Sequence, residues 1–154
     1  ASVFVVIGDN NNTDNNSRLI GEYSSISGNP LYDIFAMNNA GTTVLIRNSA
    51  GTALLNNANT ETDLRSATKK IYEFVDTGSA VSVLLDGTAI VSSAAYTRSG
   101  TMAVTRMTLG GLWRTSQSNW AEADIHEIVI TGATDSDTRN DHRNLLATTH
   151  GITL

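Results

Sequence analysis

The feature that most constrains this sequence is an Asp-Gly pair between two apolar runs. Residues 80–93 read AVSVLLDGTAIVSS, with Asp86 and Gly87 at the junction. Asp-Gly is a preferred pair for a two-residue type I′ turn, because both central positions need a positive φ. The stretch therefore predicts a tight β-hairpin.

Further apolar or alternating runs predict strands along the rest of the chain. These runs cover residues 2–8, 31–37, 42–48, 70–77, 105–111 and 123–131. Together with one Pro and 12 Gly, they predict an all-β fold, either a sandwich or a barrel. One helix is expected near the end, capped by Asp135 or Ser136, with Asp137 in its first turn and Gly151 at its end. Its apolar residues, 145–147, lie near its C-terminus, so only its last turns are expected to dock.

Composition excludes several function classes. The 154 residues suit a single domain, with 40% hydrophobic and 16% charged residues. The net charge is −5 and no basic cluster exceeds Lys69-Lys70, so no nucleic-acid partner is expected. No apolar run is long enough for membrane insertion. The absence of cysteine excludes disulfides, thiolate metal sites and Cys nucleophiles.

The surface is expected to be polar but weakly charged. Ser, Thr and Asn supply about a third of the chain, which is common in secreted proteins and virion parts. The first residues, ASVFVVIGDN, lack the basic region and long apolar core of a signal peptide. We expect an extracellular or virion-surface location. We also expect the chain to be a piece of a longer phage or bacterial surface protein.

Several segments, taken in order, resemble the concanavalin A-like, laminin G-type jelly roll. They are SVFVVI, RLIGEY, VSVLLDGTAIV, MTLGG, WAEADIHEIVIT and TDSDTRNDHRNLLATTHGI. The resemblance implies a single domain over 1–154: a two-sheet antiparallel β-sandwich with one short C-terminal α-helix. Family members usually have a strand before the first one here, which also implies a longer chain.

Three carboxylates, Glu122, Asp124 and Glu127, stand close together in WAEADIHE. Their spacing resembles the E-x-D-x-x-E strand of laminarinase-type glycoside hydrolases. On a regular strand Glu122 and Asp124 share one face and Glu127 lies on the other, and no residue marks a β-bulge that would unite them. A retaining pair needs carboxyl groups about 5 to 5.5 Å apart. No catalytic residue is therefore predicted, and the resemblance implies that Glu127 caps or pairs with nearby loop groups.

The stretch 111–120, GLWRTSQSNW, has the composition of a sugar-binding loop. An aromatic ring can stack on a sugar while polar side chains bind its hydroxyl groups. Trp120 is expected in the core, at the family's apolar position before the last strand. The predicted ligand-binding residues are Trp113, Arg114, Gln117 and Asn119.

The Asn-rich stretch 8–17 is the one candidate metal site. Asp9, Asn11, Thr13 and Asp14 offer the oxygen ligands that Ca²⁺ prefers, but the EF-hand pattern fails and two carboxylates form a weak cage. No cofactor is therefore predicted, and Ca²⁺ stays open beside the simpler interpretation of a solvated turn. The three histidines show no metal-ligand spacing; His126 is expected to face solvent or an interface, and His142 to lie on the helix surface.

These features predict a non-catalytic binding module, active in adhesion, whose partner is a glycan or a cell-surface polymer. The alternative is a structural virion decoration or fibre module that packs on copies of itself or on other virion or surface subunits. A glycoside hydrolase using Glu122, Asp124 and Glu127 is the third reading. Fold alone cannot choose among them.

Overall fold

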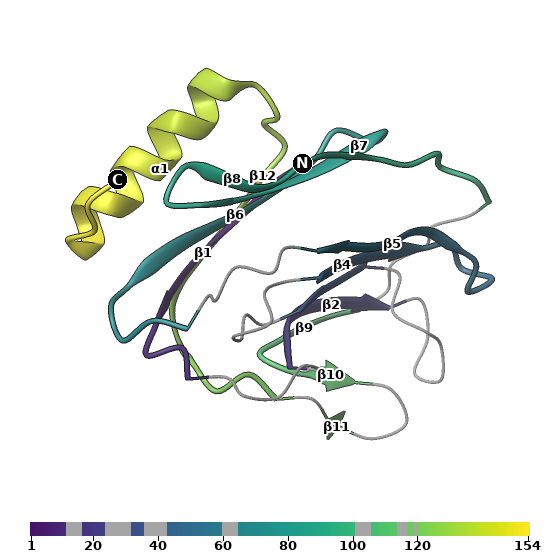
Figure 1. Cartoon of the computed structure of the whole chain (residues 1–154), viewed down its shortest axis with the longest axis horizontal. Helices are drawn as coiled ribbons and strands as arrows, with labels where there is room; N and C mark the ends of the chain where they lie inside the picture. The colour runs from purple at the N-terminus through teal and green to yellow at the C-terminus, as the bar shows by residue number, and fades with distance from the viewer. Residues whose placement is uncertain are drawn as a thin grey trace.

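The computed structural model describes residues 1–11, 17–23, 32–35, 43–59, 65–100, 106–113, 117–118 and 120–154. At 23, 32–35, 43, 56–59, 112–113 and 117–118 it describes the backbone alone. Two five-stranded antiparallel sheets face each other, and one helix lies on the outer side of the first sheet (Figure 1). The predicted all-β sandwich with a C-terminal helix is confirmed.

The two sheets have the strand orders β12-β1-β6-β7-β8 and β5-β4-β3-β2-β9. The first contains β12 (Asp124–Thr131), β1 (Ser2–Gly8), β6 (Lys70–Asp76), β7 (Ala80–Leu85) and β8 (Thr88–Ala95). The second contains β5 (Ala53–Asn59), β4 (Thr43–Arg47), β3 (Tyr32–Phe35), β2 (Arg18–Tyr23) and β9 (Arg106–Leu109). A short hairpin, β10 (Leu112–Trp113) and β11 (Gln117–Ser118), and α1 (Ser136–His150) complete the described elements.

The Asp-Gly turn joins β7 to β8 as predicted. Asp86 has φ 47° and Gly87 has φ 86°, both in the left-handed region. The Asp86 carboxylate accepts hydrogen bonds from Ile71 N at 2.8 Å and from Lys70 Nζ at 2.7 Å. The turn is therefore tied to the neighbouring strand β6 as well as closing its own hairpin.

Replacing Gly87 by alanine is expected to destabilise the protein by about 1–3 kcal/mol, because alanine disfavours a positive φ. A Cβ at this position would also lie 3.3 Å from Nη1 of Arg143 on the helix. Urea unfolding measures the change. Gly132→Ala is the matched control, since a Cβ there meets nothing within 4 Å. Equal stabilities of the two variants would contradict the prediction.

The core lies on both faces of the first sheet. Between the sheets, buried apolar side chains from both pack together, among them Val5, Ile20, Ile46 and Tyr72. On the outer face, a second cluster joins β1 and β6 to the helix through Phe4, Val6, Ile71, Leu146 and Ala147. Since β1 and β6 are covered on both sides, they consist of almost continuous buried residues.

The helix begins and ends where the sequence predicts. The side chain of Asp135 accepts a hydrogen bond from Thr138 N at 2.8 Å. Hydrogen bonding from Thr138 holds the pKa of the Asp135 carboxyl below its ordinary value. Gly151 ends the helix in the left-handed conformation, with φ 66°.

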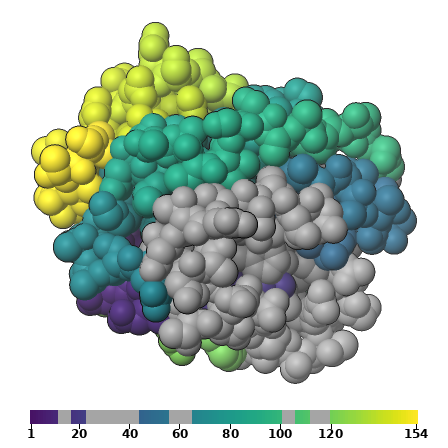
Figure 2. Space-filling model, in the orientation of Figure 1, coloured from purple at the N-terminus to yellow at the C-terminus, as the bar shows by residue number. Residues whose placement is uncertain are grey.

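The space-filling view shows α1, in yellow, as a separate layer on the teal strands of the first sheet (Figure 2). No helix in the described part of the chain is long and apolar enough to cross a membrane.

The helix docks along more of its length than the sequence suggests. Leu146 and Ala147 are buried in its C-terminal turns, as expected, although Leu145 is 64% exposed. Earlier in the helix, Arg139 and Arg143 reach a buried carboxylate on β6, Glu73. Glu73 Oε1 accepts from Arg139 Nη1 at 2.8 Å and Oε2 from Arg143 Nε at 3.1 Å. The expectation that only the last turns dock was wrong, because a buried ion pair holds the middle of the helix.

One ionisable side chain, Glu22, lies on the inner face of the second sheet. Glu22 follows Ile20 by two residues on β2, so both side chains point toward the first sheet. Partial burial raises the pKa of the Glu22 carboxyl above its ordinary value of 4.5. The folded state therefore disfavours the ionised form of this side chain.

Glu22→Gln is expected to change how stability depends on pH. A carboxyl with a raised folded pKa stabilises the fold fully below its unfolded pKa, and that contribution is lost as pH rises from 4.5 through the folded pKa. The wild type should therefore lose stability over this window relative to the glutamine variant. Urea unfolding of both proteins from about pH 4 to pH 7 tests this. Parallel stability curves would show that Glu22 carries no such penalty.

Candidate functional site

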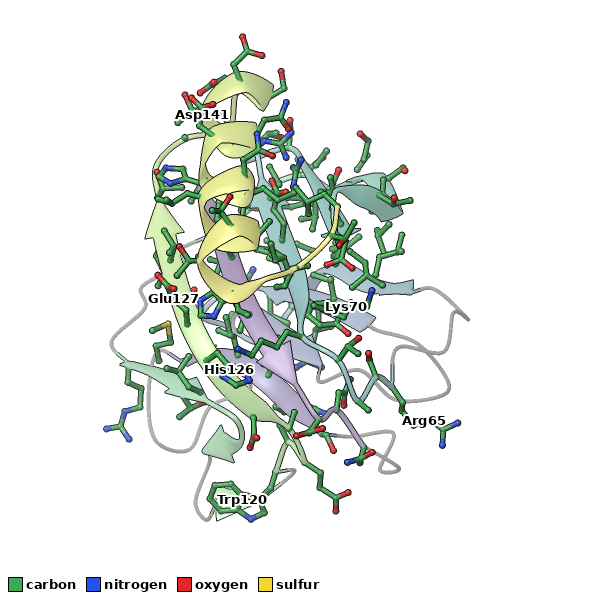
Figure 3. All side chains as sticks on the ribbon, turned by 90° about the vertical axis from the view of Figure 1, so that its left-hand side faces the viewer. Arg65, Lys70, Trp120, His126, Glu127 and Asp141 are labelled. Carbon is green, nitrogen blue, oxygen red and sulfur yellow. The ribbon has the colours of Figure 1, made fainter. Side chains whose placement is uncertain are left out.

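An exposed tryptophan marks one end of the sandwich. Trp120 lies just before β12 and is 56% exposed. Figure 3 shows it at the end of the molecule far from Asp141 of the helix. The expectation that Trp120 belongs to the core was wrong. Residue 120 precedes β12, and it is within β12 that Ile125 and Ile128 are partly buried against the core.

A glycine holds the indole in place. A Cβ at Gly111 would lie 2.8 Å from Cε3 of Trp120, so the ring packs directly against the backbone of this residue. Ala121 N donates to Gly110 O at 3.0 Å, and Gly110 N donates to Leu19 O at 2.9 Å. These bonds anchor the segment on both sides of the ring to β2. The indole is therefore a supported platform with more than half of its surface open to solvent.

The Asn-rich stretch meets this platform. Asn11 N donates to Glu122 O at 3.1 Å, and the side chains of Asp9, Asn11 and Glu122 are exposed. Asn10 is 2% exposed and exchanges two backbone bonds with Ser66. We name this region, made of Asp9, Asn11, Gly111, Trp120 and Glu122, the tryptophan end. It joins two segments that the sequence suggested as separate sites.

Of the four predicted ligand-binding residues, the structure describes only the backbones of Trp113 and Gln117. Trp113 and Gln117 are opposite each other in the β10–β11 hairpin, which begins directly after Gly111. Their side chains, and all of Arg114 and Asn119, lie outside the described residues. Their role in binding stays a prediction.

Calcium binding at the Asn-rich stretch also stays a prediction. The amide of Asn11 donates through Nδ2 to Asp9 O at 3.3 Å, and Asp9 has φ 46°. These features fit the turn interpretation. Thr13 and Asp14 lie outside the described residues. Within the described part of the chain, no three His, Asp or Glu side chains are grouped so that they could hold a metal ion.

The carboxylates of β12 are arranged differently from the prediction. Val6 pairs with Glu127 and Ile7 with Ile125, so His126 is an extra residue and β12 has a β-bulge there. Asp124 is opposite Gly8, and Gly8 and Val6 point to the same face of β1. Asp124 and Glu127 therefore share a face, whereas a regular strand would have separated them. No turn residue in the sequence indicated the bulge.

The bulge directs side chains toward the C-terminal turn of the helix. Glu127 Oε2 lies 2.7 Å from Nε2 of His150, and the rings of His126 and His150 are 6.1 Å apart. Figure 3 shows His126 and Glu127 along β12 beside the end of α1. The resemblance implied a loop partner for Glu127, but its partner is His150 on the helix, because the helix packs on this face of β12. His142, expected on the helix surface, instead contacts Phe4, with ring centroids 5.8 Å apart.

Comparisons with known proteins support the architecture. No protein-family model matches the sequence, and no curated protein matches it. Among solved structures, the chain is similar to the CBM40 of the Ruminococcus gnavus IT-sialidase, bound to α2,3-sialyllactose. The TM-score is 0.61 at 16% identity, covering 98% of this chain and 82% of that chain. The likeness does not single out the concanavalin A-like or laminin G superfamily. It shows the fold alone, a two-sheet β-sandwich.

Proposed function

We propose that this chain is a non-catalytic binding module that holds a glycan at its tryptophan end. The observation that carries the proposal is the indole of Trp120, which is supported by Gly111 and 56% exposed. Tryptophan combines a large flat apolar face with one hydrogen-bond donor, which suits a ligand with apolar and polar faces. A pyranose ring is such a ligand.

The polar side chains of the tryptophan end fit the hydroxyl groups of a sugar. The carboxylate of Glu122 accepts hydrogen bonds, and the amide of Asn11 can both donate and accept. Both side chains are exposed, and a backbone hydrogen bond holds the two residues next to each other. The predicted ligand-binding residues Trp113, Arg114, Gln117 and Asn119, which are close to Gly111 and Trp120 in the sequence, belong to the same proposal. The solved CBM40, which binds sialyllactose on a similar fold, supports a glycan as the ligand class.

Two finer statements belong to the same proposal. We infer an extracellular or virion-surface location in a phage or bacterial surface protein, because glycans are met there. We also keep the concanavalin A-like superfamily as the proposed affiliation, on the order of the segments that resemble it. Fractionation of the source cells or virions, probed with an antibody to this domain, tests the location. Recovery from the cytosol alone would contradict it.

A structural role in an assembly is the second candidate. It is favoured by three exposed apolar side chains on strands at the edges of the two sheets, Met107, Leu109 and Ile130. Such side chains suit packing against a partner subunit or a second copy. For a hydrolase the described geometry is less favourable, since Glu127 is engaged by His150 and Asp124 and Glu122 are exposed.

A glycan array with the purified domain, run with and without a calcium chelator, tests the proposal. Specific binding that survives the chelator is the expected result, since no metal is predicted. Binding that the chelator abolishes would move Ca²⁺ from an open alternative to a ligand of the Asp9 to Asp14 stretch. A blank array with a well-folded sample would overturn the glycan proposal and favour the structural role.

A further inference from the structure

The sandwich is closed along one side and open along the other. β5 lies against β8, which closes the first side. On the second side β9 and β12 are the outer strands of their sheets, and the backbones of their described residues do not approach each other closely. Among the residues that the structure describes, the inner faces of the two sheets are therefore accessible between β9 and β12.

A cleft of about 250 Å³ occupies this open side. We name it the inter-sheet cleft. Its floor consists of core side chains, Val3, Ile20 and Phe74. Met107 and Ile130, which are 42% and 56% exposed, form its rim from the two edge strands. Apolar walls with an exposed apolar rim are the usual setting of a small-molecule site.

The cleft has few polar groups. Asp76 is 6% exposed and already accepts from Tyr96 Oη at 2.8 Å and from Gly78 N at 2.7 Å. Arg98 Nη2 lies 3.2 Å from Asp76 Oδ2, so these two charges offset each other. The α-ammonium of Ala1 also lines the cleft and is engaged there, since it donates to Asp76 O at 2.8 Å. Glu22 is the remaining carboxyl that lines the cleft. It offers a hydrogen-bond acceptor within an apolar wall and disfavours an anion beside it.

The size and chemistry of the cleft together define a ligand. Its volume is below the range of roughly 300–1,000 Å³ that is typical of sites for drug-sized molecules. The body of the ligand must be apolar to match the floor, and a hydroxyl donor suits Glu22. We propose that the inter-sheet cleft binds a small neutral alcohol or phenol with an apolar body of one ring and a short chain.

This site is separate from the tryptophan end. The inter-sheet cleft lies near the start of β1, where Val3 is opposite Ile130 on β12. The tryptophan end lies near the other end of β1, where Gly8 is opposite Asp124, four residues after Trp120. The two regions share no residue. Failure of one proposal therefore leaves the other standing.

The test uses methyl-resolved NMR with two probes of similar shape, neutral 4-ethylphenol and anionic 4-ethylbenzoate. We expect 4-ethylphenol to shift the methyl resonances of Val3, Ile20, Met107 and Ile130 at millimolar concentration. The anion should bind at least tenfold more weakly, and Glu22→Gln should narrow that difference. Unmoved methyl resonances, or equal binding of both probes to the wild type, would overturn the proposal.

A filling variant provides the structural control. Ile130→Trp adds bulk at an exposed rim position, so the fold should survive, and unchanged amide resonances of α1 would verify this. It is expected to abolish the phenol-induced shifts at Val3 and Ile20. Shifts that persist would place the probe elsewhere. Shifts of the same methyl groups on raising protein concentration without a probe would assign the cleft to a second copy and would also refute the proposal.

Discussion

Glu73→Ala is expected to lower the free energy of unfolding by about 3–5 kcal/mol, because it leaves two arginines beside a buried site without their carboxylate. Glu73 is 1% exposed, and the side chains of Arg139 and Arg143 are 15% and 10% exposed. The loss corresponds to a melting temperature lower by roughly 6–20 °C for a domain of this size. Urea unfolding and thermal melts measure it.

Glu127→Ala is the matched control for Glu73→Ala. It also removes a carboxylate that holds the helix, but the side chain of Glu127 is 41% exposed. A partly exposed pair contributes at most about 1 kcal/mol. Equal losses in the two variants would show that the Glu73 pair is no better shielded from water than the Glu127 pair.

Trp120→Ala is expected to weaken glycan binding by about 30-fold or more. Exposed aromatic residues at the centre of a binding site commonly contribute about 2 kcal/mol or more, and 1.4 kcal/mol is tenfold in affinity. Because Trp120 is outside both core clusters, the thermal stability should change little. Calorimetric titration with the strongest ligand from the array measures the affinity.

A second substitution tests the support of the ring rather than the ring itself. Gly111→Ala would bring a Cβ to 2.8 Å from Cε3 and 3.0 Å from Cζ3 of Trp120, so the indole must move. We expect weaker binding with the tryptophan still present. Trp120→Phe is the control, since it keeps a flat aromatic face and should lose less affinity than Trp120→Ala. Full affinity in Gly111→Ala would show that the position of the ring does not matter.

Local chemistry made several parts of the fold predictable. Asp86 and Gly87 form their turn because few other residues accept a positive φ at both positions. The two ends of the helix were likewise predictable, because Asp135 caps its N-terminus and Gly151 ends it in the left-handed conformation. β5 was missed because its sequence, ALLNNAN, has neither alternation nor β-branched residues. β10 and β11 have two residues each, too few to show a period.

Features that depend on distant contacts could not be read from the sequence. Glu73 looks like a surface residue on an alternating strand, and only the helix that covers it makes it buried. The bulge at His126 results from pairing with β1 rather than from a local glycine. Trp120 was expected in the core from its place before the last strand. The glycine pair Gly110-Gly111 was the sequence sign of its true position, because a glycine has no Cβ to keep an aromatic ring away from the backbone.

The most direct test of the proposed glycan site is the response of the two tryptophan indole N–H resonances to a bound glycan. The protein has only Trp113 and Trp120, so the two signals can be assigned with Trp120→Phe. We predict that saturation with the strongest array ligand shifts the Trp120 indole and the amides of Asn11, Gly111 and Glu122, while the amides of α1 stay in place. An unmoved Trp120 signal at saturation would contradict the account and place the glycan elsewhere on the sandwich.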